Sequence, residues 1–304
     1  MGLAALFQAA LALASGGAEP PSHLPSLTPR QKAALVVVSG LPAPEGVAGV
    51  LVQEWSRNEP RPKRAIAFVD QEGGAASTFD ELPPGRPAWS YGSRQEAADA
   101  GFDTGKALAR NGVQVDFAPV LDLAGGPLGS RHFASPPYGV AFARGLAAGG
   151  AAPCAKHFPG LGSASISTDE NPHVRSRLRP RELAAFRAAF RLPLRCVMMG
   201  HAFYRAFGLE RRASFSPAAY RLLRRQGFDG VAVTDSISVF GSELAVPAAK
   251  RALRAGADLV LLTNGPDAAR VVHALVPLAR RGLLDEHVRR VLAFRHWLGL
   301  REVP

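Results

Sequence analysis

Six ionisable side chains stand at or directly after the ends of apolar runs, where they could act together on one substrate. They are Asp70, Asp122, Lys156, His157, His201 and Asp235. Carboxylates can serve as nucleophile or as acid/base, and Asp, Lys and His side chains can hydrogen-bond the hydroxyls of a sugar. Each residue has an ordinary structural explanation when taken alone, since an Asp after a strand often caps the next helix. As a set they favour a shared polar site.

A metal or cofactor site explains these residues less well than a sugar site. The sequence has no HxH, HExxH or closely spaced carboxylate pair of the kind that metal sites use. The glycine-rich GGPLGS stretch matches neither a phosphate-binding P-loop nor a dinucleotide-binding fingerprint. We therefore expect no metal and no cofactor.

Apolar runs rich in β-branched residues recur along the chain and predict parallel strands buried on both faces. The predicted strands are 34–39, 47–53, 65–70, 114–121, 151–156, 195–200, 230–234 and 258–262. Polar residues at the carboxyl ends of such strands would meet at one face of a closed barrel.

Helical patterns lie between most of the predicted strands. The predicted helices are 94–111, 139–149, 180–190, 217–226, 244–255 and 267–281. Gly112 and Gly227 stand where C-cap glycines belong, and Ser216-Pro217 is typical of a helix start. Only LPAPEG and SRNEPRPKR separate the first three strands, which is too short for full helices.

This alternation predicts an α/β fold, a single TIM-like (β/α)8 barrel with the first crossovers shortened. No linker or internal repeat divides the chain, so we expect residues 26–304 to form one barrel domain. We expect a monomer.

The composition limits the classes of partner. A formal net charge of +11 predicts non-specific attraction to polyanions, which leaves a polyanion-binding surface protein as a minor alternative. The arginines crowded between 175 and 225 include those of RPRELAAFRAAFR, which we interpret as the solvated face of a helix. No zinc-finger or RNP-like pattern supports a specific nucleic-acid function.

The cysteines and the N-terminus bear on location. Cys154 and Cys196 lie in apolar runs, so we expect free thiols buried in the core rather than a disulfide. LAALFQAALALA has the length of a signal-peptide core but lacks a basic region before it. Residues 1–25 are thus either a signal peptide or a disordered tail, which indicates a secreted or periplasmic protein, with a cytoplasmic one as the alternative. No other apolar run is long enough to span a bilayer.

The segment KHFPGLG, residues 156–162, closely resembles the KHFPGHG segment of glycoside hydrolase family 3, particularly its β-N-acetylglucosaminidase branch. Further segments match the family in the same order: FVDQEGG (68–74), FAPVLDL (117–123), GSRHF (129–133), GHAFY (200–204) and GFDGVAVTDS (227–236). The resemblance spans residues 34–265.

The resemblance implies a TIM-like barrel and retaining hydrolysis through a covalent glycosyl-enzyme. Asp235 matches the family's nucleophile. Asp70, Arg131, Lys156 and His157 match residues that bind the hydroxyls of the terminal sugar. Asp122 and His201 match positions that line the same pocket.

The sequence departs from the family where the acid/base catalyst belongs. The acetylglucosaminidase branch carries an Asp-x-His pair in the loop after KHFPGHG, and Ser167 and Asp169 occupy those two positions here. Leu161 replaces the histidine of KHFPGHG, and Ala75 and Thr78 replace arginines that follow DQEGG in many relatives. Loss of a general acid costs about 10²–10⁴ in rate.

Two functional hypotheses follow. The first is a retaining exo-β-N-acetylhexosaminidase acting on amino-sugar glycans such as cell-wall fragments, with Asp235 as nucleophile and Asp169 as acid/base. Glu170 or His173 could take the place of Asp169. The second is a glycan-binding pseudoenzyme that keeps the sugar site and has lost turnover.

Overall fold

The structure is a computed structural model that describes residues 26–207 and 211–304. The two expectations for residues 1–25, a signal peptide or a disordered tail, lie outside the described residues. Among the described residues, no helix combines the length and apolar content that crossing a bilayer requires.

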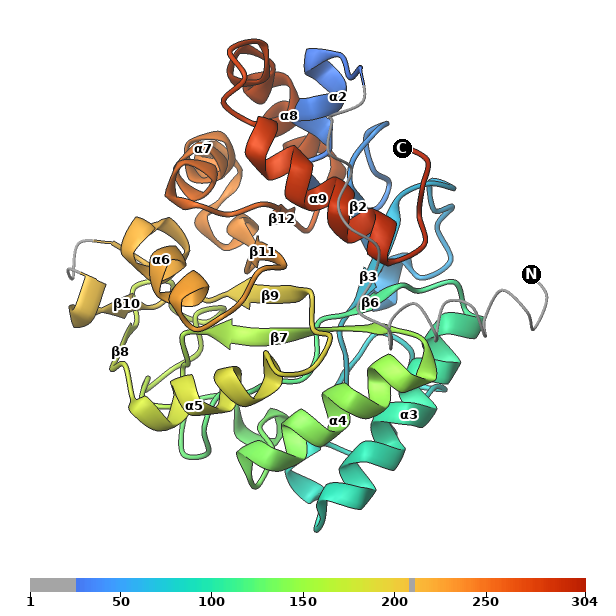
Figure 1. Cartoon of the computed structure of the whole chain (residues 1–304), viewed down its shortest axis with the longest axis vertical. Helices are drawn as coiled ribbons and strands as arrows, with labels where there is room; N and C mark the ends of the chain where they lie inside the picture. The colour runs from blue at the N-terminus through green and yellow to red at the C-terminus, as the bar shows by residue number, and fades with distance from the viewer. Residues whose placement is uncertain (1–25, 208–210) are drawn as a thin grey trace.

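Eight parallel strands form the barrel, in the order β11-β9-β7-β6-β3-β2-β1-β12 (Figure 1). Their bounds are β1 Val37–Gly40, β2 Gly49–Leu51, β3 Ile66–Val69, β6 Val115–Asp116, β7 Ala152–Phe158, β9 Cys196–Met199, β11 Val231–Thr234 and β12 Val260–Leu262. A parallel bridge between Val233 and Leu259 joins the two ends of this sheet. The predicted barrel is confirmed, and each predicted strand overlaps an observed one.

Helices surround the barrel (Figure 1). They are α2 Pro29–Ala34, α3 Arg94–Arg110, α4 Pro136–Gly149, α5 Pro180–Ala189, α6 Pro217–Arg225, α7 Ala245–Ala255, α8 Gly265–Arg280 and α9 Asp285–Trp297. Gly112 and Gly227 have positive φ after α3 and α6, as the C-cap prediction requires. The helices α2 and α9 are not among the predicted ones.

Short elements occupy the connections. No helix separates β1 from β2, and only the single turn η1, Glu54–Ser56, separates β2 from β3, so the shortened first crossovers are confirmed. The other 3-10 turns are η2 Ala88–Ser90, η3 Gly129–Arg131, η4 Arg205–Phe207, η5 Ala213–Phe215, η6 Ile237–Phe240 and η7 Ser242–Leu244. Two small strand pairs, β4 Gln71–Gly73 with β5 Ala76–Ser77 and β8 Arg175–Ser176 with β10 Phe203–Tyr204, lie outside the barrel sheet.

The barrel interior is a packed apolar core that is closed at the amino ends of the strands by Arg295 of α9. Phe68 and Phe117 stack inside it with ring centroids 5.0 Å apart. The buried Arg295 guanidinium donates to the carbonyls of Ala48 at 3.1 Å and Arg64 at 2.7 Å, just before β2 and β3. Burial lowers the pKa of Arg295 to about 10. This arginine explains why α9 was hard to predict, since a charged residue occupies a core position.

The expectation of free thiols is wrong, because Cys154 and Cys196 form a disulfide. The two residues are directly paired on β7 and β9, with Cα atoms 4.4 Å apart, and both side chains point into the barrel. The sequence placed both in the core but could not give the register that sets them opposite each other.

Removing this disulfide should lower stability without changing the fold. The bond closes a separation of 42 residues, and such cross-links typically contribute about 2–4 kcal/mol. We expect Cys154→Ala/Cys196→Ala to unfold at correspondingly lower denaturant, with an unchanged far-UV spectrum. Peptide mapping without reductant should show the linked pair in the wild type; two free thiols in protein exported to an oxidising compartment would contradict the assignment.

Candidate active site

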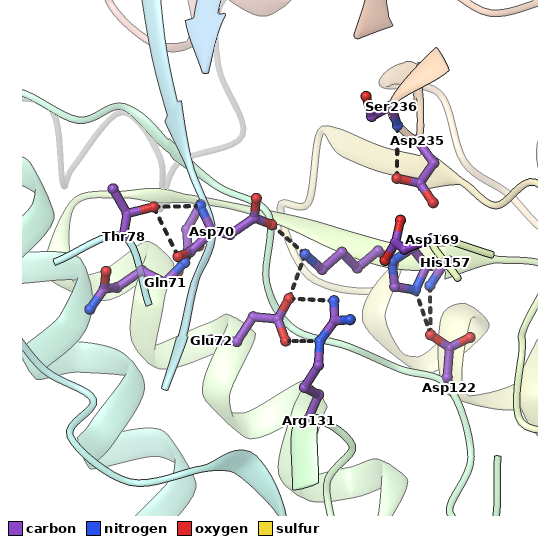
Figure 2. A network of polar contacts seen from close by, with 12 residues as sticks. Asp70, Gln71, Glu72, Thr78, Asp122, Arg131, His157, Asp169, Asp235 and Ser236 are labelled. Atoms are coloured by element: carbon purple, nitrogen blue, oxygen red, sulfur yellow. Dashed lines mark hydrogen bonds and ion pairs between the residues drawn. The ribbon is translucent and has the colours of Figure 1, made fainter. Parts of the chain in front are cut away.

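The polar residues predicted at the strand ends lie together at the carboxyl face of the barrel. Asp70 follows β3, Lys156 and His157 lie near the end of β7, and Asp235 follows β11. Figure 2 shows Asp70, His157 and Asp235 at this face together with Asp122 and Arg131, and this set of polar side chains forms the network of the site. Parallel strands deliver side chains to this face because all eight end there.

One half of the network consists of four charged side chains linked by ion pairs. The Lys156 ammonium lies 2.5 Å from an Asp70 oxygen and 2.6 Å from a Glu72 oxygen. Arg131 pairs with both oxygens of Glu72, at 2.8 and 2.9 Å (Figure 2). The Asp70 side chain is 44% exposed while those of Lys156 and Glu72 are 2% and 3% exposed. Asp70 is thus the one of these four side chains that a ligand can reach most easily.

The charges of these four side chains stabilise one another. Burial alone would raise the pKa of Glu72, but Lys156 and Arg131 outweigh burial and lower it to about 2. Burial alone would lower the pKa of Lys156, but Asp70 and Glu72 outweigh burial and raise it. Glu72 and Lys156 therefore remain charged at neutral pH, which preserves the charge-assisted hydrogen bonds between them.

Asp122 fixes His157 and the start of the next loop. One Asp122 oxygen accepts from the His157 backbone N–H at 3.1 Å and lies 2.7 Å from Nδ1, and the other accepts from the Leu161 N–H at 2.5 Å. Burial lowers the pKa of His157, but Asp122 outweighs burial and, with a smaller effect of Asp235, raises it. With Nδ1 engaged by Asp122, Nε2 is the ring nitrogen left for a ligand.

His201 is held on both ring nitrogens. Its Nε2 lies 3.0 Å from the Ser236 carbonyl, which can only accept, so Nε2 donates and Nδ1 accepts from the Ser214 hydroxyl at 2.8 Å. Burial lowers the pKa of His201, which keeps the ring neutral. Arg212 donates to the His201 carbonyl and stacks on Phe240 beside the ring. His201 therefore orients the segment after Asp235.

Asp235 follows β11 and is 9% exposed. One carboxylate oxygen accepts from the Ser236 N–H at 2.8 Å, which leaves the other without a protein donor in the described part of the chain (Figure 2). Burial raises the pKa of Asp235, but the positive charge of His157, the hydrogen bond from the Ser236 N–H and the Lys156 ammonium lower it overall. An ionised carboxylate with a free oxygen has the properties of a nucleophile.

The loop after KHFPGLG brings one carboxylate near this network. The exposed Asp169 accepts from the Ser167 hydroxyl at 3.3 Å, and its charge acts on the pKa values of Arg131 and His201. Figure 2 draws Asp169 among the side chains of the network. The exposed His173 instead stacks on Phe203, with ring centroids 6.5 Å apart. The charge of Asp169 therefore acts on His201, which lies next to the Asp235 segment, whereas His173 packs against Phe203.

Three buried carboxyl groups of the site were not singled out from the sequence. Glu72 lies inside the quoted DQEGG motif, and Asp116 accepts from the Gln71 N–H at 2.9 Å, with burial raising its pKa to about 8. Glu182 of α5 accepts from the Gly162 N–H at 2.6 Å, and burial raises its pKa to about 7. The available signal was a charged residue within an apolar pattern, as in QVDFAPV and RELAAF.

The described residues contain no group of three or more His, Cys, Asp or Glu side chains arranged to hold a metal ion. The Lys156 ammonium lies between the Asp70 and Glu72 carboxylates and contacts both.

Comparison with known proteins places this geometry in a family. Residues 49–294 match the glycosyl hydrolase family 3 N terminal domain. A β-hexosaminidase of Alkalilimnicola ehrlichii is 37% identical over 246 residues, which cover 71% of this chain and 70% of that protein. A β-hexosaminidase of Methylococcus capsulatus is 34% identical over 240 residues, 71% of each chain.

Comparison with solved structures leads to the same family. A family 3 glycosyl hydrolase from Mycobacterium smegmatis superposes with a TM-score of 0.77 and 26% identity, covering 88% of this chain and 96% of that one. A family 3 β-N-acetylglucosaminidase from a Paenibacillus species gives a TM-score of 0.78 and 25% identity, covering 91% of this chain and 64% of that one. These matches extend over the barrel and every strand that carries a residue of the network, so the chain belongs to glycosyl hydrolase family 3.

Proposed function

We propose that this chain is a retaining exo-β-N-acetylhexosaminidase that removes terminal β-linked N-acetylhexosamine from amino-sugar glycans such as cell-wall fragments. The observation that carries the proposal is Asp235, an ionised and half-satisfied carboxylate beside a network of hydroxyl-binding groups. The names of the family 3 relatives, β-hexosaminidase and β-N-acetylglucosaminidase, support the sugar class.

The proposed reaction has two steps. The Asp235 carboxylate attacks the anomeric carbon while the carboxylic acid of Asp169 gives its proton to the departing glycosidic oxygen, which leaves as an alcohol. Asp169, now a carboxylate, then takes a proton from a water molecule. The resulting hydroxide displaces Asp235 from the sugar and restores both carboxyl groups.

The remaining residues are proposed to hold the terminal sugar. Asp70 and Arg131 offer a carboxylate and a guanidinium to its hydroxyls, and the Lys156 ammonium sets the position of Asp70. His157 offers Nε2, with Asp122 holding the ring. His201 positions the Ser236 backbone that donates to Asp235. No cofactor enters this scheme.

Substitutions in the loop should identify the acid. We expect Asp169→Asn to slow cleavage of a natural disaccharide by about 10²–10⁴-fold and cleavage of an activated aryl glycoside much less, because that leaving group needs little protonation. Glu170→Gln is the matched control on the neighbouring exposed carboxylate and should change neither rate by more than about threefold.

Other results would reassign the role. A loss confined to Glu170→Gln or to His173→Gln would transfer the acid to that residue. Sugar binding by calorimetry together with no product from wild-type protein would instead favour the glycan-binding pseudoenzyme, the alternative that the missing Asp-x-His pair motivates.

For location, we propose a secreted or periplasmic protein in which residues 26–304 act as one monomeric barrel domain and residues 1–25 as its signal peptide. The Cys154–Cys196 disulfide supports this, since disulfides persist mainly in oxidising compartments. Cell fractionation with N-terminal sequencing tests it; an intact N-terminus in a cytosolic fraction would support the cytoplasmic alternative.

A further inference from the structure

A groove of about 1010 Å³ lies on the outer side of the barrel between α4 and α5. Its floor is the segment after β6, including Leu121 and Leu123, and its walls include Val140 of α4 and Ala184 and Ala188 of α5. Figure 1 shows these two helices side by side with α3 on the far side of α4. The groove is thus separate from the residues proposed to bind the sugar, apart from Asp122 in its floor.

Close packing on one side of α4 leaves its other side open. Against α3, backbone meets backbone: a Cβ added at Gly145 would lie 2.0 Å from the Ala98 carbonyl oxygen, and one added at Gly149 would lie 2.3 Å from the Phe102 carbonyl oxygen. Towards α5 the helix presents Val140 and Arg144 to the groove instead. Small apolar side chains in such a groove allow close approach of another chain.

Five arginines surround the groove, and all five are exposed. They are Arg94, Arg144, Arg179, Arg181 and Arg191. Within residues 26–207 and 211–304, none of them forms an ion pair or a hydrogen bond to a carboxylate. By contrast, Arg224 and Arg290 both pair with Asp258. Among the described residues that line the groove, Asp122 is the only acidic one, and it is engaged by His157 and Leu161.

The positions of these charges describe the occupant. Arg181, Ala184, Ala185 and Ala188 follow a spacing of three and four residues and so share one face of α5. Arg181 lies in the first turn of α5, and Arg191 lies two residues beyond its last residue, Ala189, so the two arginines stand at opposite ends of this helix. Positive charge is therefore spread along the groove with an apolar strip between. A matching ligand is elongated, apolar on one side and negative at several points.

These features fit an acidic amphipathic helix better than the other occupants considered. A lipid with one anionic headgroup would need its charge partners at one end only. A second copy of this chain carries the same net charge of +11 and would be repelled. Residues 1–25 contain one carboxylate side chain, Glu19, which could satisfy at most one of these arginines. We propose that the α4–α5 groove binds an acidic amphipathic helix of a partner protein.

Fluorescence anisotropy of labelled synthetic peptides against the full chain tests this. The probe is a helix of about four turns with Leu and Ala on one face and Glu on its flanks, compared with a scrambled peptide of equal composition and a peptide with Lys for Glu. We expect saturable binding of the first peptide, about tenfold weaker binding of the scrambled one and no binding of the Lys peptide.

Protein variants locate the binding. Arg181→Glu/Arg191→Glu should weaken binding of the acidic peptide by about tenfold or more. Ala184→Trp fills the groove without changing the charge and should weaken binding of this peptide as well. Arg254→Glu/Arg280→Glu makes the same charge change on α7 and α8, where both side chains are exposed, and should leave affinity within about twofold.

The proposal is overturned if the scrambled peptide binds as tightly as the ordered one, or if both double variants weaken binding equally, because either result means attraction by net charge alone. It is also overturned if the Arg181→Glu/Arg191→Glu variant loses binding to phosphatidylglycerol vesicles but still binds the peptide. Binding unaffected by Ala184→Trp would likewise place the peptide elsewhere.

Discussion

Asp235→Asn is expected to reduce kcat/KM for an aryl β-N-acetylglucosaminide by about 10⁴-fold or more, because an amide cannot form the glycosyl-enzyme. The aryl substrate isolates the nucleophile, since its leaving group places little demand on the acid. Binding of N-acetylglucosamine should persist, because the hydroxyl-binding groups around Asp70, Lys156 and Arg131 are untouched.

Asp229→Asn is the matched control for this experiment. Asp229 lies just before β11, at the opposite end of the strand from Asp235, and its side chain is 74% exposed in a pair with Arg195. The control should retain wild-type kinetics, and both variants should unfold near the wild-type temperature. Equal rates in wild type and Asp235→Asn would remove Asp235 from the mechanism.

Glu72→Gln is expected to lower the free energy of unfolding by about 3–5 kcal/mol, the usual cost of breaking a buried ion pair from one side. The change leaves Arg131 without its bidentate partner and removes one of the two carboxylates that hold Lys156. Chemical denaturation at neutral pH measures the loss. Glu81→Gln, in the exposed pair with Arg57, should cost less than about 1 kcal/mol.

The pH dependence gives a second readout for Glu72. Its pKa is lowered to about 2 in the folded protein, whereas an unfolded glutamate titrates near about 4.3. Its contribution is therefore complete above the unfolded value and is lost as pH falls through about 2. Wild-type stability should fall over this window more steeply than that of Glu72→Gln; parallel curves would show that the ion pairs contribute nothing.

The barrel was predictable because its strands are short apolar runs between helical patterns. The ends differ little for some elements: 230–234 is predicted where β11 spans Val231–Thr234, and 94–111 where α3 spans Arg94–Arg110. They differ more for the predicted strand 114–121, of which β6 covers only Val115–Asp116. The strand-end residues followed from the same pattern, because parallel strands carry their polar ends to one face. Residue types and order along the chain were sufficient for these predictions.

Features that depend on register or on a buried charge were not predictable in this way. Cys154 and Cys196 became partners only because β7 and β9 pair in register. Glu72 and Asp116 sit in the core with partners that come from distant segments. Arg295 is buried in α9 at a position where an amphipathic helix normally has an apolar residue, so the apolar pattern did not predict this helix. The sequence predicted that the arginines beside α5 form a solvated face. Their arrangement around a groove was not predictable, because the groove depends on how α4 packs beside α5.

Covalent labelling tests the central claim most directly. A 5-fluoro-N-acetylglucosaminyl fluoride should form a slowly hydrolysed glycosyl-enzyme with a retaining catalyst, and peptide mapping of the inactivated protein should find one sugar, attached to Asp235. Attachment to another carboxylate, or turnover of the natural glycan by a protein that never accumulates an adduct, would contradict the account.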